Sequence, residues 1–149
     1  MGDRAWYLDM AAEKIGLLIG KITASSSVYE TEPWGFKDDT PFLNRLHVTD
    51  TRLEPEALIR TLEAIEKKLG RVRSGNRYGP RTLDIDILFY NDRVINHNGL
   101  IIPHPELHKR RFALEPLAEV NPAFVHPVLG KTVAGLLAEC NDPCGVRKL

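Results

Sequence analysis

Two aspartates and a run of basic residues lie next to each other near the middle of the sequence. Asp84 and Asp86 are separated by Ile85, and the stretch 67–82 before them contains lysines and arginines but no acidic residue. On a strand, both carboxylates would share one face, roughly 6–7 Å apart along the backbone. Carboxylate oxygens suit Mg²⁺, which is held by one or two carboxylates together with substrate phosphates, and arginine presents a fork of donors that fits phosphate oxygens. The pattern favours a site that handles a polyphosphate.

Simpler interpretations stay open for these residues. Two aspartates on one face can form the solvated side of an edge strand that pairs with nearby arginines, and a basic run can be a solvated surface or a nucleic-acid patch. His104 and His108 have no accompanying glutamate that would complete a zinc-protease motif. His104, between two prolines, is better suited to donate to phosphate.

A second candidate site combines an aromatic ring with an amide. Phe42 and Asn44 share one face of a predicted strand, and an amide that donates and accepts at once suits the edge of a heterocycle. Thr31, Trp34 and Phe112 lie in or near predicted loops. The alternative is that both phenylalanines are ordinary core residues.

The hydrophobic pattern supplies the elements that must position these residues. Apolar spacings of three and four indicate helices, and alternation indicates strands. We expect helices over 3–20, 54–70, 106–114 and 133–140, strands over 22–29, 42–48 and 83–90, a turn at 91–92 that opens a hairpin, and loops over 30–41 and 70–81. Helices and strands do not alternate regularly, which favours an α+β fold over a doubly wound sheet.

Composition narrows the class of protein. The chain has 149 residues, with Lys plus Arg equal to Asp plus Glu at 20 each, so we expect one domain over 1–149 and no nucleic-acid partner bound through net charge. No apolar run approaches the length of a membrane span and no signal peptide is recognisable, so we expect a cytoplasmic protein without a membrane partner. Cys140 and Cys144 fit neither a disulfide framework nor a zinc pattern.

The stretch 77–88, RYGPRTLDIDIL, resembles the signature of the hydroxymethyldihydropterin pyrophosphokinase family of folate synthesis. Further segments match in the family's order and spacing, and together they cover nearly all of the chain: 28–35, 42–44, 70–73, 94–96, 102–105 and 110–112. The resemblance implies a single ferredoxin-like α/β sandwich with a mostly antiparallel sheet. Members begin with a strand and a Gly-Ser-Asn turn, whereas this sequence starts near the end of that turn, so we expect the domain to be N-terminally short and to lack the family's first strand.

The resemblance also implies an activity and a set of site residues. The implied enzyme is a Mg²⁺-dependent diphosphotransferase that moves the pyrophosphoryl group of ATP to the hydroxymethyl group of 6-hydroxymethyl-7,8-dihydropterin and releases AMP. Asp84 and Asp86 are the implied ligands of two Mg²⁺ ions and, with Arg71 and Arg81, the implied catalytic residues. The implied ATP contacts are Glu66, Arg71, Arg73, Arg77, Tyr78, Arg81, Ile87, His104 and Arg110, and the implied pterin contacts are Thr31, Trp34, Phe42, Asn44 and Phe112. Other folate-pathway enzymes are the implied candidates for protein partners.

Two positions depart from the family's pattern. Tyr78 stands where many members carry a tryptophan, and it stacks with less area. Phe42 stands where tyrosine is frequent, which loses a hydroxyl but keeps the stacking face.

A rival interpretation is a non-catalytic α+β module that binds single-stranded RNA through its basic loop and exposed aromatics. The neutral net charge and the paired aspartates argue against it, because carboxylates repel a phosphate backbone unless a cation intervenes.

Overall fold

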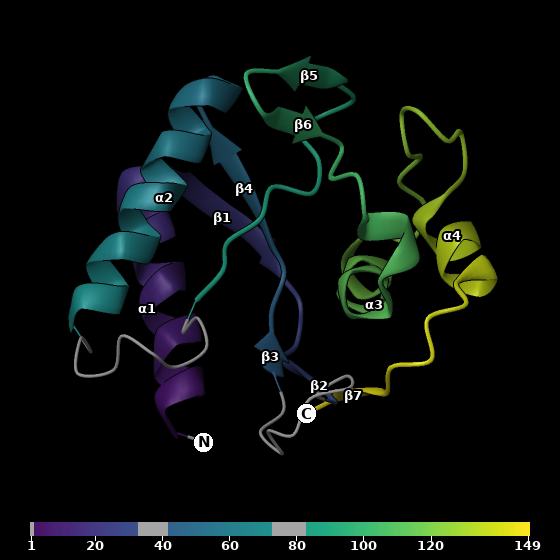
Figure 1. The fold of residues 1–149 in the computed structure, drawn as a ribbon, viewed down its shortest axis with the longest axis horizontal. Coiled ribbons are helices and arrows are strands. Elements are labelled where there is room, and N and C mark those ends of the chain that lie inside the picture. The colour runs from purple at the N-terminus through teal and green to yellow at the C-terminus, as the bar shows by residue number, and fades with distance from the viewer. Residues whose placement is uncertain (1, 33–41, 73–82) are drawn as a thin grey trace. The chain divides into compact units, whose positions relative to one another are not determined.

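The computed structural model describes residues 2–32, 42–72 and 83–149 (Figure 1). The chain packs as two compact units. The first unit consists of Met1–Thr23 and His47–Asp86, and the second unit consists of Ala24–Leu46 and Ile87–Leu149. Each unit therefore takes an early segment and a later segment of the sequence.

The first unit is built on two helices that pack against each other, α1 (Gly2–Leu18) and α2 (Pro55–Val72). Strands β1 (Gly20–Ser25) and β4 (His47–Thr51) form a two-stranded sheet. Each helix buries one apolar stripe, at spacings of four along α1 and on to Ile19 just after it, and at spacings of three and four along α2. The buried residues are Tyr7, Ala11, Ile15, Ile19, Leu58, Leu62, Ile65 and Leu69.

A close backbone approach joins β1 to β4. A side-chain carbon on Gly20 would overlap the carbonyl oxygen of Asp50, so only glycine fits at the start of β1. Beside it, the Thr51 hydroxyl donates to the carbonyl oxygen of Ile19 at 2.8 Å. These contacts fix where β1 leaves α1.

The second unit contains a three-stranded antiparallel sheet with β2 (Tyr29–Thr31) in the centre, between β3 (Phe42–Asn44) and β7 (Val146–Lys148). A separate hairpin joins β5 (Ile95–His97) to β6 (Leu100–Ile102). Its turn residues, Asn98 and Gly99, have φ of 52° and 81°. Asn-Gly is favoured in two-residue hairpin turns because both residues tolerate positive φ.

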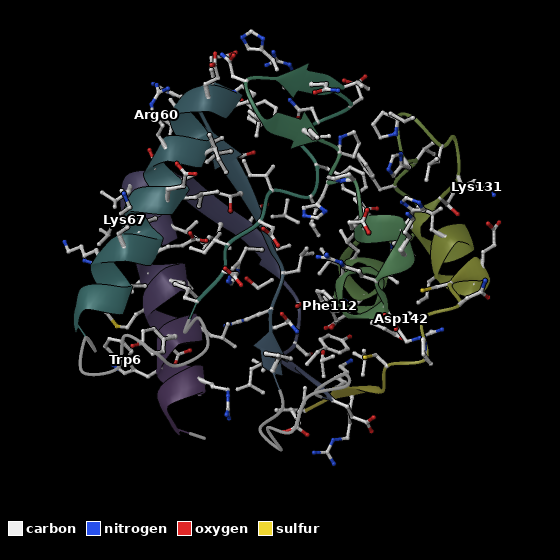
Figure 2. The ribbon with its side chains drawn as sticks, in the orientation of Figure 1. Trp6, Arg60, Lys67, Phe112, Lys131 and Asp142 are labelled. Atoms are coloured by element: carbon white, nitrogen blue, oxygen red, sulfur yellow. The ribbon has the colours of Figure 1, made fainter. Side chains whose placement is uncertain are left out.

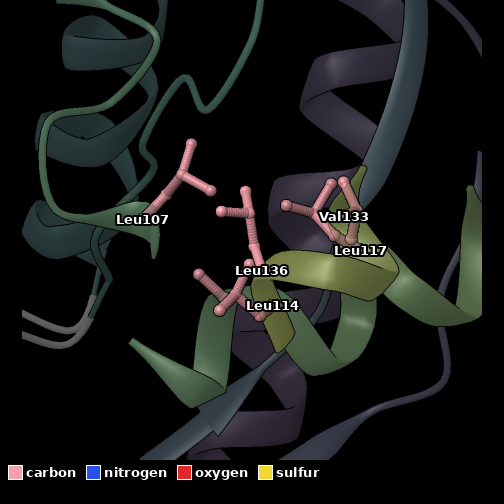
Figure 3. Close-up of a cluster of buried hydrophobic side chains, with 6 residues drawn as sticks. Leu107, Leu114, Leu117, Val133 and Leu136 are labelled. Carbon is pink, nitrogen blue, oxygen red and sulfur yellow. The ribbon is translucent and has the colours of Figure 1, made fainter. Parts of the chain in front are cut away.

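The core of the second unit lies between α3 (Arg111–Val120), α4 (Val133–Glu139) and the short 3₁₀ helix η1 (Leu107–Lys109). Leu107, Leu114 and Val133 are each 0% exposed. Figure 3 shows them with Leu117 and Leu136 as one cluster, to which all three helices contribute. This cluster holds the start of α3, where two predicted site residues, Arg110 and Phe112, lie.

The α+β class predicted from the sequence is confirmed, and several elements differ from the expectation. The predicted strand over 83–90 is wrong, since 83–89 has no regular secondary structure. The strand expected over 42–48 divides into β3 and β4, and the helix expected over 106–114 divides into η1 and the longer α3. The predicted turn at 91–92 is present, with the Arg93 N–H donating to the carbonyl oxygen of Tyr90 at 3.1 Å, but the hairpin lies farther along, with its turn at Asn98–Gly99. The single domain over 1–149 and the missing first strand stay predictions.

None of the helices in the described ranges is both long and apolar enough to cross a membrane.

Candidate active site

The two aspartates lie in the irregular segment 83–89. Asp84 and Asp86 are exposed, whereas Leu83, Ile85 and Ile87 are half-buried. This alternation is the one expected of an extended chain. Both carboxylates are therefore accessible to a ligand in solution, although no ladder of strand hydrogen bonds carries them.

A glutamate from α2 holds the backbone between the aspartates. Oε2 of Glu66 accepts a hydrogen bond from the backbone N–H of Ile85 at 2.6 Å. Glu66 lies four residues after Leu62 and three before Leu69, so it borders the buried stripe of α2 and is itself half-buried. The resemblance implied a nucleotide contact for Glu66. The structure gives this carboxylate a main-chain contact that fixes the aspartate segment on α2.

His104 belongs to the second unit and lies just after β6. Its backbone N–H donates to the carbonyl oxygen of Leu88 at 2.9 Å, which joins the segment that follows the aspartates to the segment that follows the hairpin. Its ring nitrogen Nδ1 accepts from the backbone N–H of Glu106 at 3.1 Å. In the neutral ring the proton is therefore on Nε2. A fixed Nε2–H is a suitable donor to a phosphate oxygen.

Arg110 and Phe112 meet at the start of α3. The guanidinium carbon of Arg110 lies 5.6 Å from the centroid of the Phe112 ring, within cation–π range. Phe112 extends from the first turn of α3 (Figure 2), and both residues are half-buried. A predicted phosphate contact and a predicted pterin contact are thus neighbours in the structure.

Three further predicted pterin contacts gather on β2 and β3. Thr31 lies opposite Phe42 in the register of the two strands, and Nδ2 of Asn44 donates to the Thr31 hydroxyl at 3.2 Å. Thr31 is 4% exposed, whereas Phe42 is 47% exposed. Phe42 is therefore not a buried core residue, and its ring is open to a flat ligand beside a hydrogen-bonded Thr–Asn pair.

Several predicted site residues fall outside the described residues. Trp34, Arg73, Arg77, Tyr78 and Arg81 do so entirely, and for Arg71, within α2, only the backbone is described. Of the described ones, the first unit contains Glu66, Asp84 and Asp86, and the second contains Thr31, Phe42, Asn44, Ile87, His104, Arg110 and Phe112.

Among the described residues, the first unit has two exposed carboxylates, Asp84 and Asp86, and the second unit has an exposed ring, an amide and basic side chains. Comparison with known proteins identifies the family. Residues 1–122 match the family model of 7,8-dihydro-6-hydroxymethylpterin-pyrophosphokinase. The chain belongs to this family.

Individual relatives agree with the family model. The chain is 40% identical over 131 residues to the 2-amino-4-hydroxy-6-hydroxymethyldihydropteridine pyrophosphokinase of Aquifex aeolicus, covering 88% of this chain and 81% of that protein. It is 39% identical over 150 residues to the Methylorubrum extorquens protein of the same name, covering 100% and 92%. It is also 39% identical over 142 residues to the folic acid synthesis protein fol1 of Pneumocystis carinii, covering 95% of this chain but 19% of that protein.

Proposed function

We propose that this chain transfers the pyrophosphoryl group of ATP to the hydroxymethyl group of 6-hydroxymethyl-7,8-dihydropterin and releases AMP, a step of folate synthesis. The match of 1–122 to the family model carries the proposal. In this reaction the hydroxymethyl oxygen forms a bond to the β-phosphorus of ATP, and the bond from that phosphorus to the oxygen bridging the α-phosphate breaks. AMP leaves with the bridging oxygen, and the hydroxyl proton is released.

Asp84 and Asp86 are the proposed ligands of two Mg²⁺ ions. The support is that both carboxylates are exposed on alternate residues and that Glu66 holds the amide between them. Within the described ranges, no three His, Cys, Asp or Glu side chains gather into a metal site, so most ligand positions would be left to phosphate oxygens and water, as Mg²⁺ prefers. Bound Mg²⁺ would neutralise the charge that develops on the transferred phosphates.

The remaining residues bind and orient the two substrates. His104, through Nε2–H, and Arg110 donate to the phosphates, with Glu66 and Ile87 beside the nucleotide. The chain contributes further ATP contacts from the basic stretch before Asp84: Arg71, Arg73, Arg77, Tyr78 and Arg81. Phe42 and Phe112 stack on the two faces of the pterin, and Thr31, Trp34 and Asn44 contact its edge. A ferredoxin-like sandwich is the proposed arrangement of the whole domain.

The direct test measures AMP formed from ATP, Mg²⁺ and 6-hydroxymethyl-7,8-dihydropterin. We expect AMP only when the pterin is present. Asp84→Asn and Asp86→Asn should each lower kcat at least about 100-fold, while Asp92→Asn, an exposed aspartate in the following turn, serves as the matched control with unchanged kcat.

Two results would contradict the proposal. Wild-type protein that forms no pterin-dependent AMP but binds single-stranded RNA in a salt-sensitive manner would favour the rival RNA-binding module. Asp84→Asn protein with normal kcat and an unchanged Mg²⁺ requirement would overturn the metal assignment alone.

A further inference from the structure

A carboxylate outside all the predicted site residues joins two elements of the second unit. Oε1 and Oε2 of Glu119, near the end of α3, accept from the backbone N–H of Ser27 at 3.1 and 3.2 Å, and Oε2 also accepts from the Ser27 hydroxyl at 3.0 Å. Oε1 accepts from the hydroxyl of Tyr29 at 2.7 Å. Nζ of Lys148, in β7, lies 3.9 Å from Oε2. One side chain thus fastens α3 to the start of β2.

Tyr29 and Glu119 keep their ionisation states around neutral pH. Tyr29 is 5% exposed, and burial, together with its hydrogen bond to Glu119, raises the pKa of Tyr29 to about 12. The same hydrogen bond, aided by those from Ser27, lowers the pKa of Glu119. A neutral phenol therefore donates to a charged carboxylate, and such charge-assisted bonds are stronger than neutral ones.

Tyr29 is connected through β2 and β3 to three of the proposed pterin contacts, Thr31, Asn44 and Phe42. Tyr29 and Thr31 are two residues apart on β2 and share its buried face. Tyr29 lies directly opposite Asn44 in the register with β3, and Thr31 lies opposite Phe42. Because Asn44 also donates to Thr31, a shift of Tyr29 along β2 displaces Thr31, Asn44 and Phe42 together.

Glu119 and Phe112 lie on the same face of α3. They are seven residues apart, which is about two helical turns or roughly 10 Å along the axis. α3 contacts both β2 and β7, and Figure 1 shows its ribbon next to these strands. The carboxylate therefore fixes the spacing between the ring on α3 and the strands that carry the other ring.

From this arrangement we propose that Glu119 is a positioning residue for the pterin side of the site, through its hydrogen bonds to Ser27 and Tyr29. It sets the separation of the Phe42 and Phe112 rings, between which a flat heterocycle stacks. The inference rests on the proposed function and adds a residue to it. Stacking energy falls when ring faces move out of contact, so loosening this tie weakens binding of the heterocycle more than binding of the nucleotide.

The experiment compares Glu119→Gln with Tyr29→Phe and with Glu139→Gln. The first replaces one acceptor oxygen by an NH2 group, which can only donate, so the four contacts of the carboxylate with Ser27 and Tyr29 cannot all be kept. The second removes the Tyr29 donor. Glu139 is the matched control, an exposed glutamate at the end of α4 that pairs with Lys131 at 2.8 Å. Each variant is titrated with 6-hydroxymethyl-7,8-dihydropterin in the presence of Mg²⁺ and α,β-methylene ATP, and separately with that analogue alone, well below its melting temperature.

We expect Glu119→Gln to raise the Kd and the KM for the pterin about tenfold and to leave the Kd of the ATP analogue within about twofold. Tyr29→Phe should give a smaller change in the same direction, and the double variant should fall short of the product of the two effects because both act on one contact. Glu139→Gln should match the wild type. If Glu119→Gln does not fold, Tyr29→Phe alone decides the result.

An unchanged pterin Kd in these variants, or equal losses for the pterin and the ATP analogue, would overturn the positioning role. The proposed function fails separately, when the wild-type protein forms no AMP in response to the pterin. A wild-type enzyme that is active while both variants bind the pterin normally contradicts only the role of Glu119.

Discussion

The start of α3 is capped by an aspartate from the distant segment after α4. Oδ2 of Asp142 accepts from the backbone N–H of Arg111 at 3.0 Å, and Oδ1 accepts from the backbone N–H of Cys144 at 3.0 Å. The first N–H groups of a helix have no partner within the helix, and the local cap residue, Arg110, makes no side-chain capping bond. Asp142 therefore caps α3 in place of a local serine or aspartate, and its negative charge interacts favourably with the helix N-terminus.

The cost of removing this carboxylate follows from the contacts that are lost. A cap is worth about 1 kcal/mol, the interaction with the helix dipole adds about 0.5 kcal/mol, and the bond to Cys144, a charged acceptor on a backbone donor, adds about 1.5 kcal/mol. Asp142→Ala should therefore lower the free energy of unfolding by about 3 kcal/mol, which corresponds to a fall of roughly 6–12 °C in Tm for a domain of this size. Asp142→Asn keeps one acceptor oxygen and should lose about half as much.

Urea unfolding followed by circular dichroism measures these differences directly, with the slope m unchanged if only stability has altered. Asn141→Ala is the matched control, because Asn141 is the exposed neighbour of Asp142 and its replacement should change the free energy of unfolding by less than about 0.5 kcal/mol. Equal stabilities for Asp142→Ala and Asn141→Ala would refute the capping role.

Three further perturbations test other parts of the structure. Leu114→Ala, at a side chain that is 0% exposed, should lower the free energy of unfolding by about 3–4 kcal/mol in denaturant titration. Gly20→Ala should destabilise the protein by more than about 2 kcal/mol because the new methyl group meets a β4 carbonyl. Gly16→Ala, in α1 with nothing near the new methyl group, should stabilise it by about 0.5–1 kcal/mol. Equal Tm values for the two variants would contradict both expectations. The pKa of Tyr29 is raised to about 12, so its contribution to stability is complete below the unfolded-state pKa of about 10 and is lost by about 1.4 kcal/mol per pH unit as the pH rises toward 12. Tyr29→Phe should remove this loss from the pH dependence of the free energy of unfolding, and identical pH profiles for the variant and the wild type would exclude the contribution of Tyr29.

The sequence predicts the helices better than the strands because a helix closes its hydrogen bonds locally. The apolar spacing of Leu58, Leu62, Ile65 and Leu69 leads to α2 within two residues of its observed end. The segment 83–87 alternates in exposure as predicted, but alternation describes side chains and contains no information on whether a partner strand supplies the ladder. The hydrophobic pattern does not predict the hairpin turn at Asn98–Gly99, although Asn-Gly is a recognised turn signal, because its flanking strands are three residues each and too short to show a pattern.

The residues of the candidate site also differ in whether a local sequence pattern reveals them. Asp84, Asp86, Phe42 and Asn44 stand out because their residue types are unusual for their positions or share a strand face. Glu66 and Glu119 do not, since an acidic residue on a helix is read as part of a solvated surface. Glu119 contacts a residue 92 positions away, and no local pattern encodes a hydrogen bond over that separation.

The bond between Glu66 and Ile85 has a consequence for which sequences this site tolerates. Its donor is a backbone N–H, which every residue except proline possesses. The half-buried side chain at position 85 can therefore vary among apolar types, while proline is excluded. Insertion or deletion of one residue between Asp84 and Asp86 is excluded as well, because it would move the tethered amide away from the midpoint of the two carboxylates. Sequence changes in this segment must therefore keep the spacing of Asp84 and Asp86, whereas the side chain between them can change.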